Sequence, residues 1–121
     1  MLPATGVRSG CVDVWVEAAT RPEADGPVVV VHLGNPCDHS AMVDLGKLQV
    51  VGLDGNGGSW PLTLYDPAGE IEPRRIDAYA WGEEWIEAHA DQQRAFAWLD
   101  VDVGSIEHAG PVRWVRIAVP R

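Results

Sequence analysis

Two carboxylates near the end of the chain have the spacing of residues that can act together. Asp100 and Asp102 lie two positions apart in the segment F96-A-W-L-D-V-D-V103. On a strand, such residues point to the same face at a separation of roughly 7 Å. That separation suits an acid–base pair or a divalent cation. A solvated strand face has the same pattern, and we favour it, so a small carboxylate- or metal-dependent enzyme is a remote alternative.

The histidines form no recognised metal or catalytic motif. They are His32, His39, His89 and His108. None has the H-x-H or H-E-x-x-H spacing of a zinc site. Asp38 beside His39 invites comparison with an orienting dyad, but Ser40 is too close in sequence to serve as its nucleophile, and no G-x-S-x-G motif is present. We therefore predict no catalytic residue, no cofactor and no metal.

The two cysteines, Cys11 and Cys37, permit one disulfide. If residues 11–19 and 27–34 form a hairpin, Cys11 begins one strand and Cys37 lies just beyond the end of the other. The two thiols would then lie near each other. A bridge would indicate an oxidising compartment and two free thiols a reducing one, and the sequence leaves both open. The wide spacing argues against a zinc knuckle.

Large aromatic residues occupy polar positions of three strand-like segments. In 11–17 the valines alternate, which leaves Trp15 beside acidic residues. In 96–103 the alternating apolar residues leave Phe96 and Trp98 beside the two aspartates, and in 113–119 they leave Trp114 beside Arg116. Because successive side chains of a strand point to opposite faces, these strands are expected to place rings on the polar face.

Rings beside carboxylates suit two kinds of ligand. Tryptophan is a frequent anchor for a protein partner, and an aromatic ring can also stack on the apolar face of a sugar. A third interpretation is that Trp81, Trp85 or an edge loop covers the rings as a second packed layer. The candidate binding residues are Trp15, Phe96, Trp98, Asp100, Asp102 and Trp114.

Short apolar runs recur along the chain between turn signals, which is typical of an all-β sandwich or barrel. Residues 82–94 contain strong helix formers, and they also alternate between apolar and polar residues. Two interpretations remain open: a strand followed by a loop, or a short helix. Residues 1–9 are expected to form a loose tail or a short edge strand, and Val101, Val115 and Ile117 are expected in the core. The expected strands lie near 11–19, 27–34, 41–45, 47–53, 59–65, 74–80, 84–89, 95–103 and 112–119.

Length and charge limit the classes of partner. The 121 residues fit a single domain, 1–121. A net charge of −9 disfavours nucleic acid and anionic membrane surfaces. No stretch approaches the roughly 20 apolar residues of a membrane span. No secretory signal is evident, and V7-R-S-G-C11 departs from a lipid-attachment box at Arg8.

Three segments resemble a known group of domains. They are V28-V-V-V-H-L-G-N-P-C-D38, M42-V-D-L-G-K-L-Q-V-V-G-L-D-G55 and L62-T-L-Y-D-P-A-G-E-I-E-P73. Together they resemble uncharacterised β-sandwich domains of predicted lipoproteins from myxobacteria-like bacteria, over about half of the chain. The resemblance implies an immunoglobulin-like sandwich, an envelope location and no known activity. Its motifs are turn and core patterns, so it assigns no functional residue.

The sequence thus predicts an all-β protein, a single immunoglobulin-like antiparallel β-sandwich of seven to nine strands. We expect a non-catalytic protein-interaction or assembly module, in an envelope or decorating a larger particle. A glycan-binding module that uses Trp15, Trp98 and Trp114 is the alternative. A cell-envelope or extracellular location is favoured over the cytoplasm, while the partner and the oligomeric state stay open.

Overall fold

The computed structural model describes residues 6–21, 26–65, 73–91, 95–104, 106 and 112–120. Within these ranges the secondary structure consists of ten strands and one 3-10 turn, η1, at Leu45–Lys47. The chain is therefore an all-β protein, as the apolar runs predict. None of the described segments is a helix with the length and apolarity that crossing a membrane requires.

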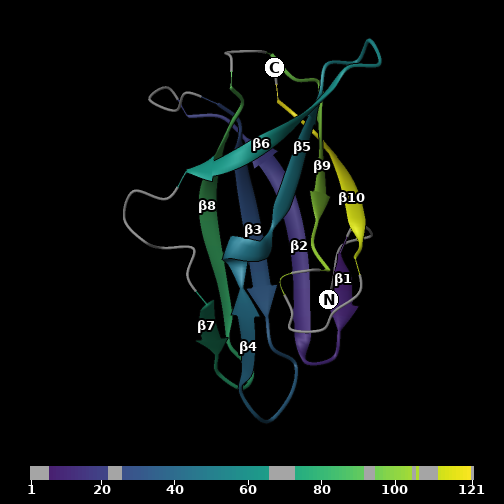
Figure 1. Ribbon diagram of the computed structural model, residues 1–121. Helices are drawn as coiled ribbons and strands as arrows, with labels where there is room; N and C mark the ends of the chain where they lie inside the picture. Colours follow the sequence, from purple (N-terminus) through teal and green to yellow (C-terminus); the bar gives the residue numbers. More distant parts are fainter. Residues whose placement is uncertain are drawn as a thin grey trace.

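Eight strands form one antiparallel sheet and two form a smaller one (Figure 1). In spatial order the large sheet contains β1 (Val7–Ser9), β2 (Val12–Ala19), β3 (Val28–Gly34), β8 (Trp81–His89), β6 (Ser59–Tyr65), β5 (Gln49–Leu53), β9 (Trp98–Asp102) and β10 (Trp114–Ala118). The small sheet pairs β4 (Ala41–Asp44) with β7 (Pro73–Ile76).

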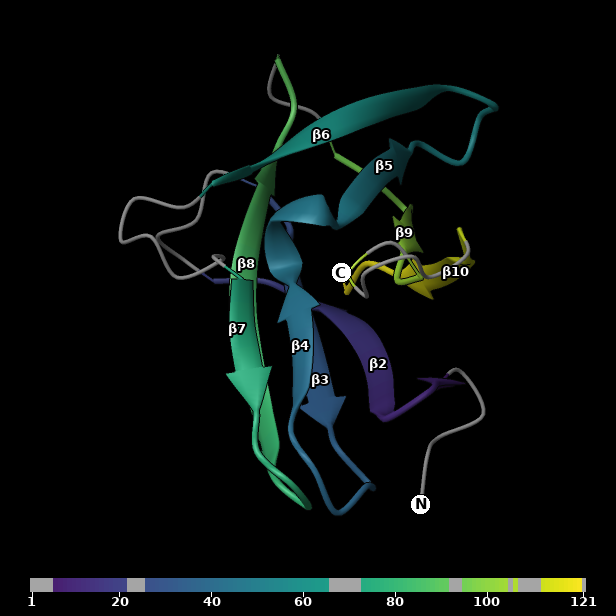
Figure 2. The same cartoon turned by 60° about the horizontal axis from the view of Figure 1, so that its bottom comes forward.

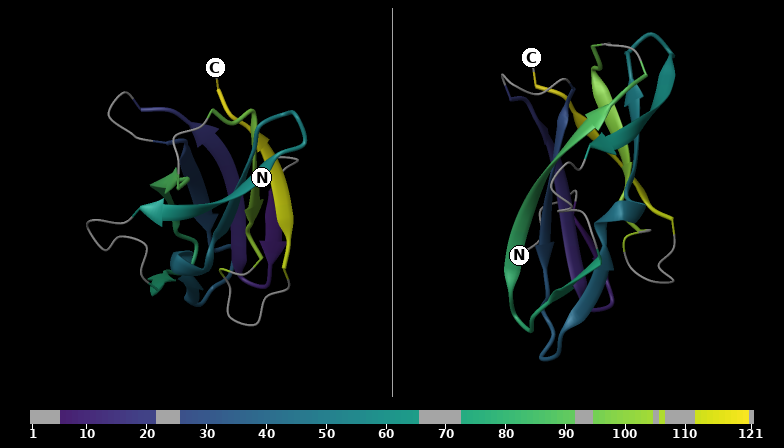
Figure 3. Two further views of the ribbon diagram at one scale, coloured as in Figure 1. Left: turned by 45° about the horizontal axis from the view of Figure 1, so that its top comes forward. Right: turned by 60° about the vertical axis from the view of Figure 1, so that its left-hand side comes forward.

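Strand β6 makes the large sheet curl into a sandwich-like fold. Its first part pairs with β5, from Ser59 opposite Leu53 to Leu62 opposite Val50. Its last three residues, Thr63–Tyr65, pair with β8 instead. Figure 2 shows β6 crossing from β8 towards β5, and Figure 3 shows the two layers that result. One layer contains β1, β2, β3 and β8, and the other contains β5, β9 and β10.

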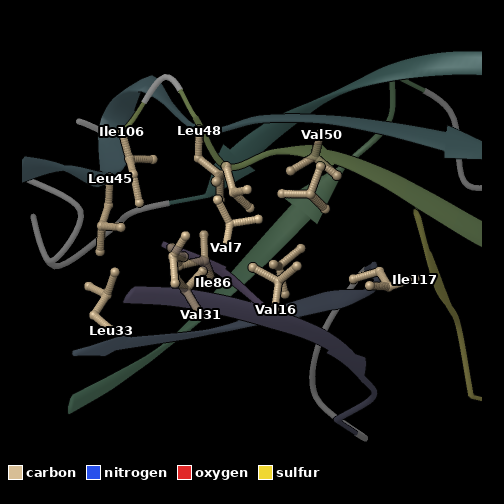
Figure 4. Packing of buried hydrophobic residues seen from close by; sticks show 14 of the residues in the cluster. Val7, Val16, Val31, Leu33, Leu45, Leu48, Val50, Ile86, Ile106 and Ile117 are labelled. Carbon is tan, nitrogen blue, oxygen red and sulfur yellow. The ribbon is translucent and has the colours of Figure 1, made fainter. Parts of the chain in front are cut away.

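The core lies between these layers. Val16 and Val31 point inwards from β2 and β3, towards Val50 on β5 (Figure 4). Leu99 and Val101 on β9 have no exposed surface. The expected core residues Val101 and Ile117 are buried, and Val115 is half-buried against the same cluster. The faces assigned to the last two strands from sequence alternation are confirmed.

The nine expected strands correspond to β2 through β10, and β1 is the short edge strand expected at the amino-terminal end. In the ambiguous segment 82–94 the strand prevails, because β8 pairs with β3 from Val28 opposite Glu87 to Gly34 opposite Trp81. Tertiary pairing thus overrides the helix propensity of these residues. Residues 1–5, 92–94 and His108 lie outside the described part of the chain.

Candidate functional site

Trp98 and Trp114 lie on the same outer face, as the sequence predicts. In the pairing of β9 with β10, Trp98 is opposite Ala118 and Trp114 is opposite Asp102. Their exposed fractions are 43% and 47%. Between them the Arg116 guanidinium donates two hydrogen bonds to the Asp100 carboxylate, at 2.8 and 3.1 Å.

The remaining predicted residues of this segment are not available for binding. Asp102 is buried, and its carboxylate accepts hydrogen bonds from the backbone N–H groups of Gly104 (3.0 Å) and Arg113 (2.9 Å). It therefore fixes the end of β9, because a buried carboxylate needs such partners. This corrects the expectation that Asp102 forms part of an exposed surface with Asp100.

Phe96 also departs from its expected place. Its ring is buried against the backbone of β5, where a Cβ atom added to Gly52 would lie 2.5 Å from the ring. It meets Trp60 at a centroid distance of 6.0 Å. The alternation that placed Phe96 beside Trp98 fails because β9 begins at Trp98. Phe96 is a core residue rather than a binding residue.

Trp15 lies on β2, which pairs with neither β9 nor β10. It is half-buried on the outer side of β2 and stacks on His32 of β3, with ring centroids 3.9 Å apart and an interplanar angle of 15°. Strand β2 follows β1 at one end of the large sheet, whereas β9 and β10 form the other end. No strand pairing joins Trp15 to Trp98 or Trp114, although the curl of the sheet brings β10 into contact with β2.

Trp15 instead belongs to a second exposed surface, formed by β2, β3 and β8. The strand registers place nine residues of its outer side in three rows, Asp13–Gly34–Trp81, Trp15–His32–Glu83 and Glu17–Val30–Trp85. Tryptophans and carboxylates alternate around a central histidine. We call the six residues Trp15, Glu17, His32, Trp81, Glu83 and Trp85 the tryptophan–acid face.

The two tryptophans of β8 are the most accessible part of this face. Trp81 is 56% exposed and Trp85 is 41% exposed. The Trp81 ring lies over Gly34, because a Cβ atom added there would be 2.7 Å from the ring. The Trp85 indole N–H donates to a Glu83 carboxylate oxygen at 3.2 Å. Both rings are held in place while much of their apolar surface remains open to a partner.

Two exposed carboxylates of the tryptophan–acid face flank its central histidine. The carboxylates of Glu17 and Glu83, each more than half exposed, lie 3.8 and 3.3 Å from the two ring nitrogens of His32. Asp13 is buried in the adjacent row and accepts two hydrogen bonds from Arg8, at 2.6 and 2.8 Å. These hydrogen bonds are the main reason that the pKa of the Arg8 guanidinium is raised, and the negative charge of Asp13 is the second.

An arginine of the chain itself, Arg21, lies against one of the tryptophans of this face. The Arg21 guanidinium carbon lies 5.0 Å from the centroid of the Trp85 ring. A cation at this distance is attracted by the negative face of an indole. The face can therefore hold a guanidinium against a tryptophan.

The sequence contained a signal for this surface. In W81-G-E-E-W85 the two tryptophans are four residues apart, a spacing that shares a face on a helix and on a strand. Helix propensity leaves the segment ambiguous, and covering of other rings by Trp81 or Trp85 is one of the three interpretations that the sequence allows. Only the pairing of β3 with β8 places them beside Trp15 and His32.

Two small hollows lie near these elements. One, of about 170 Å³, lies beside Trp81 and is lined by Leu33, Arg75, Ile76, Asp77, Ala80 and Gly82. The other, of about 200 Å³, lies between η1 and the β4–β7 pair. Both are smaller than the roughly 300–1,000 Å³ of ordinary small-molecule pockets. The first is lined in part by Leu33 and Ile76, which belong to the core.

Cys11 and Cys37 form a disulfide, with Cα atoms 5.5 Å apart. Cys11 lies in the turn between β1 and β2, and Cys37 lies in the loop that follows β3. The hairpin of β2 and β3 brings these positions together, as the sequence suggested. Of the two states that the sequence left open, the structure has the bridged one.

A buried asparagine holds the loop that carries Cys37. The Asn35 side-chain amide donates to the backbone carbonyls of His39 (2.7 Å) and Ile76 (3.0 Å), and its oxygen accepts from the Cys37 N–H (2.9 Å). Its backbone N–H donates to the Ala80 carbonyl. The loop thus has a fixed shape that does not depend on the disulfide alone.

Replacing Asn35 with alanine should lower the free energy of unfolding by about 1–3 kcal/mol, because buried backbone groups lose their partners. Chemical denaturation of the oxidised protein measures the loss. Asn56→Ala in the exposed β5–β6 turn is the matched control, since within the described part of the chain the hydrogen bond of Asn56 comes from its backbone N–H, which donates to the Asp54 carboxylate. Equal stabilities for the two variants would contradict the role of Asn35.

Comparison with known proteins supports the fold and leaves the family open. No family model matches the chain, and no curated protein matches it in sequence. The structure is similar to the crystal structure of the yjhA protein from Bacillus subtilis, a structural genomics target, with a TM-score of 0.55 at 9% identity. The match covers 95% of this chain and 96% of that chain. At this identity the likeness shows the fold alone, which the two chains share over nearly all of their length.

Proposed function

We propose that this chain is a non-catalytic protein-interaction module whose tryptophan–acid face binds a segment rich in lysine and arginine on a partner protein. The observation that carries the proposal is the contact of Arg21 with Trp85. A guanidinium from the chain itself occupies the position that a partner's cation would take. The neighbouring carboxylates of Glu17 and Glu83 supply the opposite charge.

Physical magnitudes favour such a partner. A cation over an aromatic ring contributes about 0.5–1 kcal/mol when exposed and about 2 kcal/mol or more when desolvated. Exposed tryptophans supply apolar area that a partner can cover. The net charge of −9 steers a basic partner towards the chain and raises its association rate.

We further propose an envelope or extracellular setting, where the module takes part in an assembly. The Cys11–Cys37 disulfide supports this setting, because such bonds persist in oxidising compartments. The resemblance to lipoprotein sandwich domains also implies an envelope location. On the same resemblance we propose that the sandwich has an immunoglobulin-like topology.

The first test measures binding of a lysine- and arginine-rich peptide by isothermal titration calorimetry at low salt. The double variant Trp81→Ala/Trp85→Ala should weaken binding by about 30-fold or more, the effect of losing one hot-spot residue. Trp98→Ala/Trp114→Ala is the matched control and should bind like the wild type. Equal losses in both double variants would contradict the proposal.

A second variant distinguishes specific binding of a cation over Trp85 from non-specific binding of the peptide. Arg21→Ala should tighten binding of the basic peptide, because it removes the internal competitor over Trp85. Arg116→Ala, which releases Asp100 on the opposite end of the sheet, should leave the affinity unchanged. Weaker binding by Arg21→Ala would show that the partner's cation does not take its place.

A glycan remains the second candidate, and its support is the pair of exposed rings on β9 and β10. Trp98 and Trp114 share one sheet face with Asp100 between them. Such rings can stack on the apolar faces of sugars, while the carboxylate accepts hydrogen bonds from hydroxyl groups. Binding of an oligosaccharide that is lost in Trp98→Ala/Trp114→Ala would favour this function.

A further inference from the structure

Three metal-ligating side chains that are far apart in the sequence meet at one end of the β2–β3 hairpin. The sulfur atoms of Cys11 and Cys37 and a ring nitrogen of His39 all lie within 4.8 Å of one another. The His39 Nε2 atom lies 3.4 Å from the Cys11 Sγ atom. Thiolate and imidazole are the ligands that zinc prefers in proteins.

The histidine also has the partner that metal-bound histidines usually have. Its other ring nitrogen, Nδ1, lies 3.2 Å from a carboxylate oxygen of Asp38. When a carboxylate accepts from one ring nitrogen, the other is left as a metal ligand, and the ring orientation is fixed. In His39 that second nitrogen is the one directed at the sulfur atoms.

The backbone around the three ligands is held by contacts other than the disulfide. Cys11 follows Gly10, whose φ of 57° forms the tight turn between β1 and β2. Asn35 anchors both Cys37 and His39 through the buried hydrogen bonds described above. Opening the sulfur–sulfur bond therefore leaves the three side chains near one another.

We propose that reduction of the Cys11–Cys37 disulfide creates a Zn²⁺ site formed by Cys11, Cys37 and His39, with Asp38 as the outer partner of the histidine. A dithiol reductant supplies two electrons and two protons, is itself oxidised to a disulfide, and leaves two thiols on this chain. Zn²⁺ then displaces the two thiol protons and binds both thiolates and the His39 Nε2 atom.

The required movement is small. Zinc lies about 2.3 Å from sulfur and about 2.0–2.1 Å from nitrogen. Tetrahedral geometry then places the ligand atoms roughly 3.5 Å apart, so the two bonded sulfur atoms have to move apart, to a spacing still within the 4.8 Å that contains the three ligand atoms. His39 is exposed and the two cysteines are half-buried, so solvent has access to the fourth position. The redox state of the chain would thus decide whether this end of the hairpin holds a covalent bond or a metal.

The test uses the full chain, reduced with a phosphine and titrated with Zn²⁺ in competition with a chromophoric chelator. The reduced protein should bind one Zn²⁺ and the oxidised protein none. Co²⁺ as a spectroscopic probe should give the thiolate-to-metal charge-transfer band of cysteine ligation in the reduced protein alone. Asp38→Asn, which changes the outer partner of the histidine, should weaken Zn²⁺ binding about tenfold. His39→Ala removes a ligand itself, so it should weaken Zn²⁺ binding by more than the roughly 100-fold upper limit for an outer partner.

Controls keep the result decisive. His89→Ala, which changes a histidine of β8 far from the cysteines in sequence, should bind Zn²⁺ like the wild type. Circular dichroism of the reduced, metal-free protein reports whether the fold persists, and recovery of a lost fold on adding Zn²⁺ would support the site. Absence of Zn²⁺ binding by the reduced chain, or unchanged affinity in His39→Ala, would overturn the proposal.

Discussion

Phe96→Ala should lower the free energy of unfolding by about 3–5 kcal/mol, the usual cost of removing a buried aromatic ring. The ring fills the space above Gly52 and contacts Trp60, so its removal leaves a cavity between β5 and the chain that leads into β9. The loss is a large part of the stability of an ordinary domain, about 5–15 kcal/mol. Chemical denaturation with a constant slope gives the difference.

Trp98→Ala is the matched control for Phe96→Ala. It removes a larger aromatic side chain two positions along the same segment, but 43% of that side chain is already exposed. We expect it to lose less stability, because part of that ring is already in water and its removal opens no enclosed cavity. A larger loss of stability for Trp98→Ala than for Phe96→Ala would contradict the structure, because it would show that Trp98 is buried and Phe96 is exposed.

Reduction of the disulfide should lower the free energy of unfolding by about 3.5 kcal/mol in the presence of a metal chelator. The bond closes a loop with a sequence separation of 26 residues, and this value is the chain entropy that a loop of such length removes from the unfolded state. Because ordinary domains have about 5–15 kcal/mol of stability, the reduced chain is expected to stay folded.

The double variant Cys11→Ser/Cys37→Ser supplies the control for reduction. It should show the same loss without reductant and no further change when reductant is added. A stability change below about 1 kcal/mol on reduction would contradict the loop-closure argument. Adding Zn²⁺ should return part of the lost stability to the reduced wild type, and none to the double variant.

Local patterns were sufficient for the strands and for the core face of the last two. Alternation of Val115, Ile117 and Val119 placed Ile117 inside because one face of that strand is buried. The same argument failed for Phe96, which lies before the first residue of β9, where side chains no longer alternate across a sheet. It also failed for Asp102, whose burial depends on backbone groups of the following loop.

The tryptophan–acid face needed long-range information. Its members come from three strands, and β3 pairs with β8 across about fifty residues of chain, a register that no local pattern specifies. The stacking of Trp15 on His32 and the contact of Arg21 with Trp85 follow from that pairing. For the same reason no local pattern places His39 beside Cys11, because the two residues belong to different loops that only the β2–β3 pairing brings together.

The six tryptophans allow a direct test of which face binds. Each indole N–H gives its own signal in a proton–nitrogen correlation spectrum, and single replacements assign them. On adding a lysine- and arginine-rich peptide, the signals of Trp81 and Trp85 should move most and that of Trp15 should follow, whereas those of Trp98 and Trp114 stay in place. Movement confined to Trp98 and Trp114, or no movement of any indole signal, would contradict binding at the tryptophan–acid face.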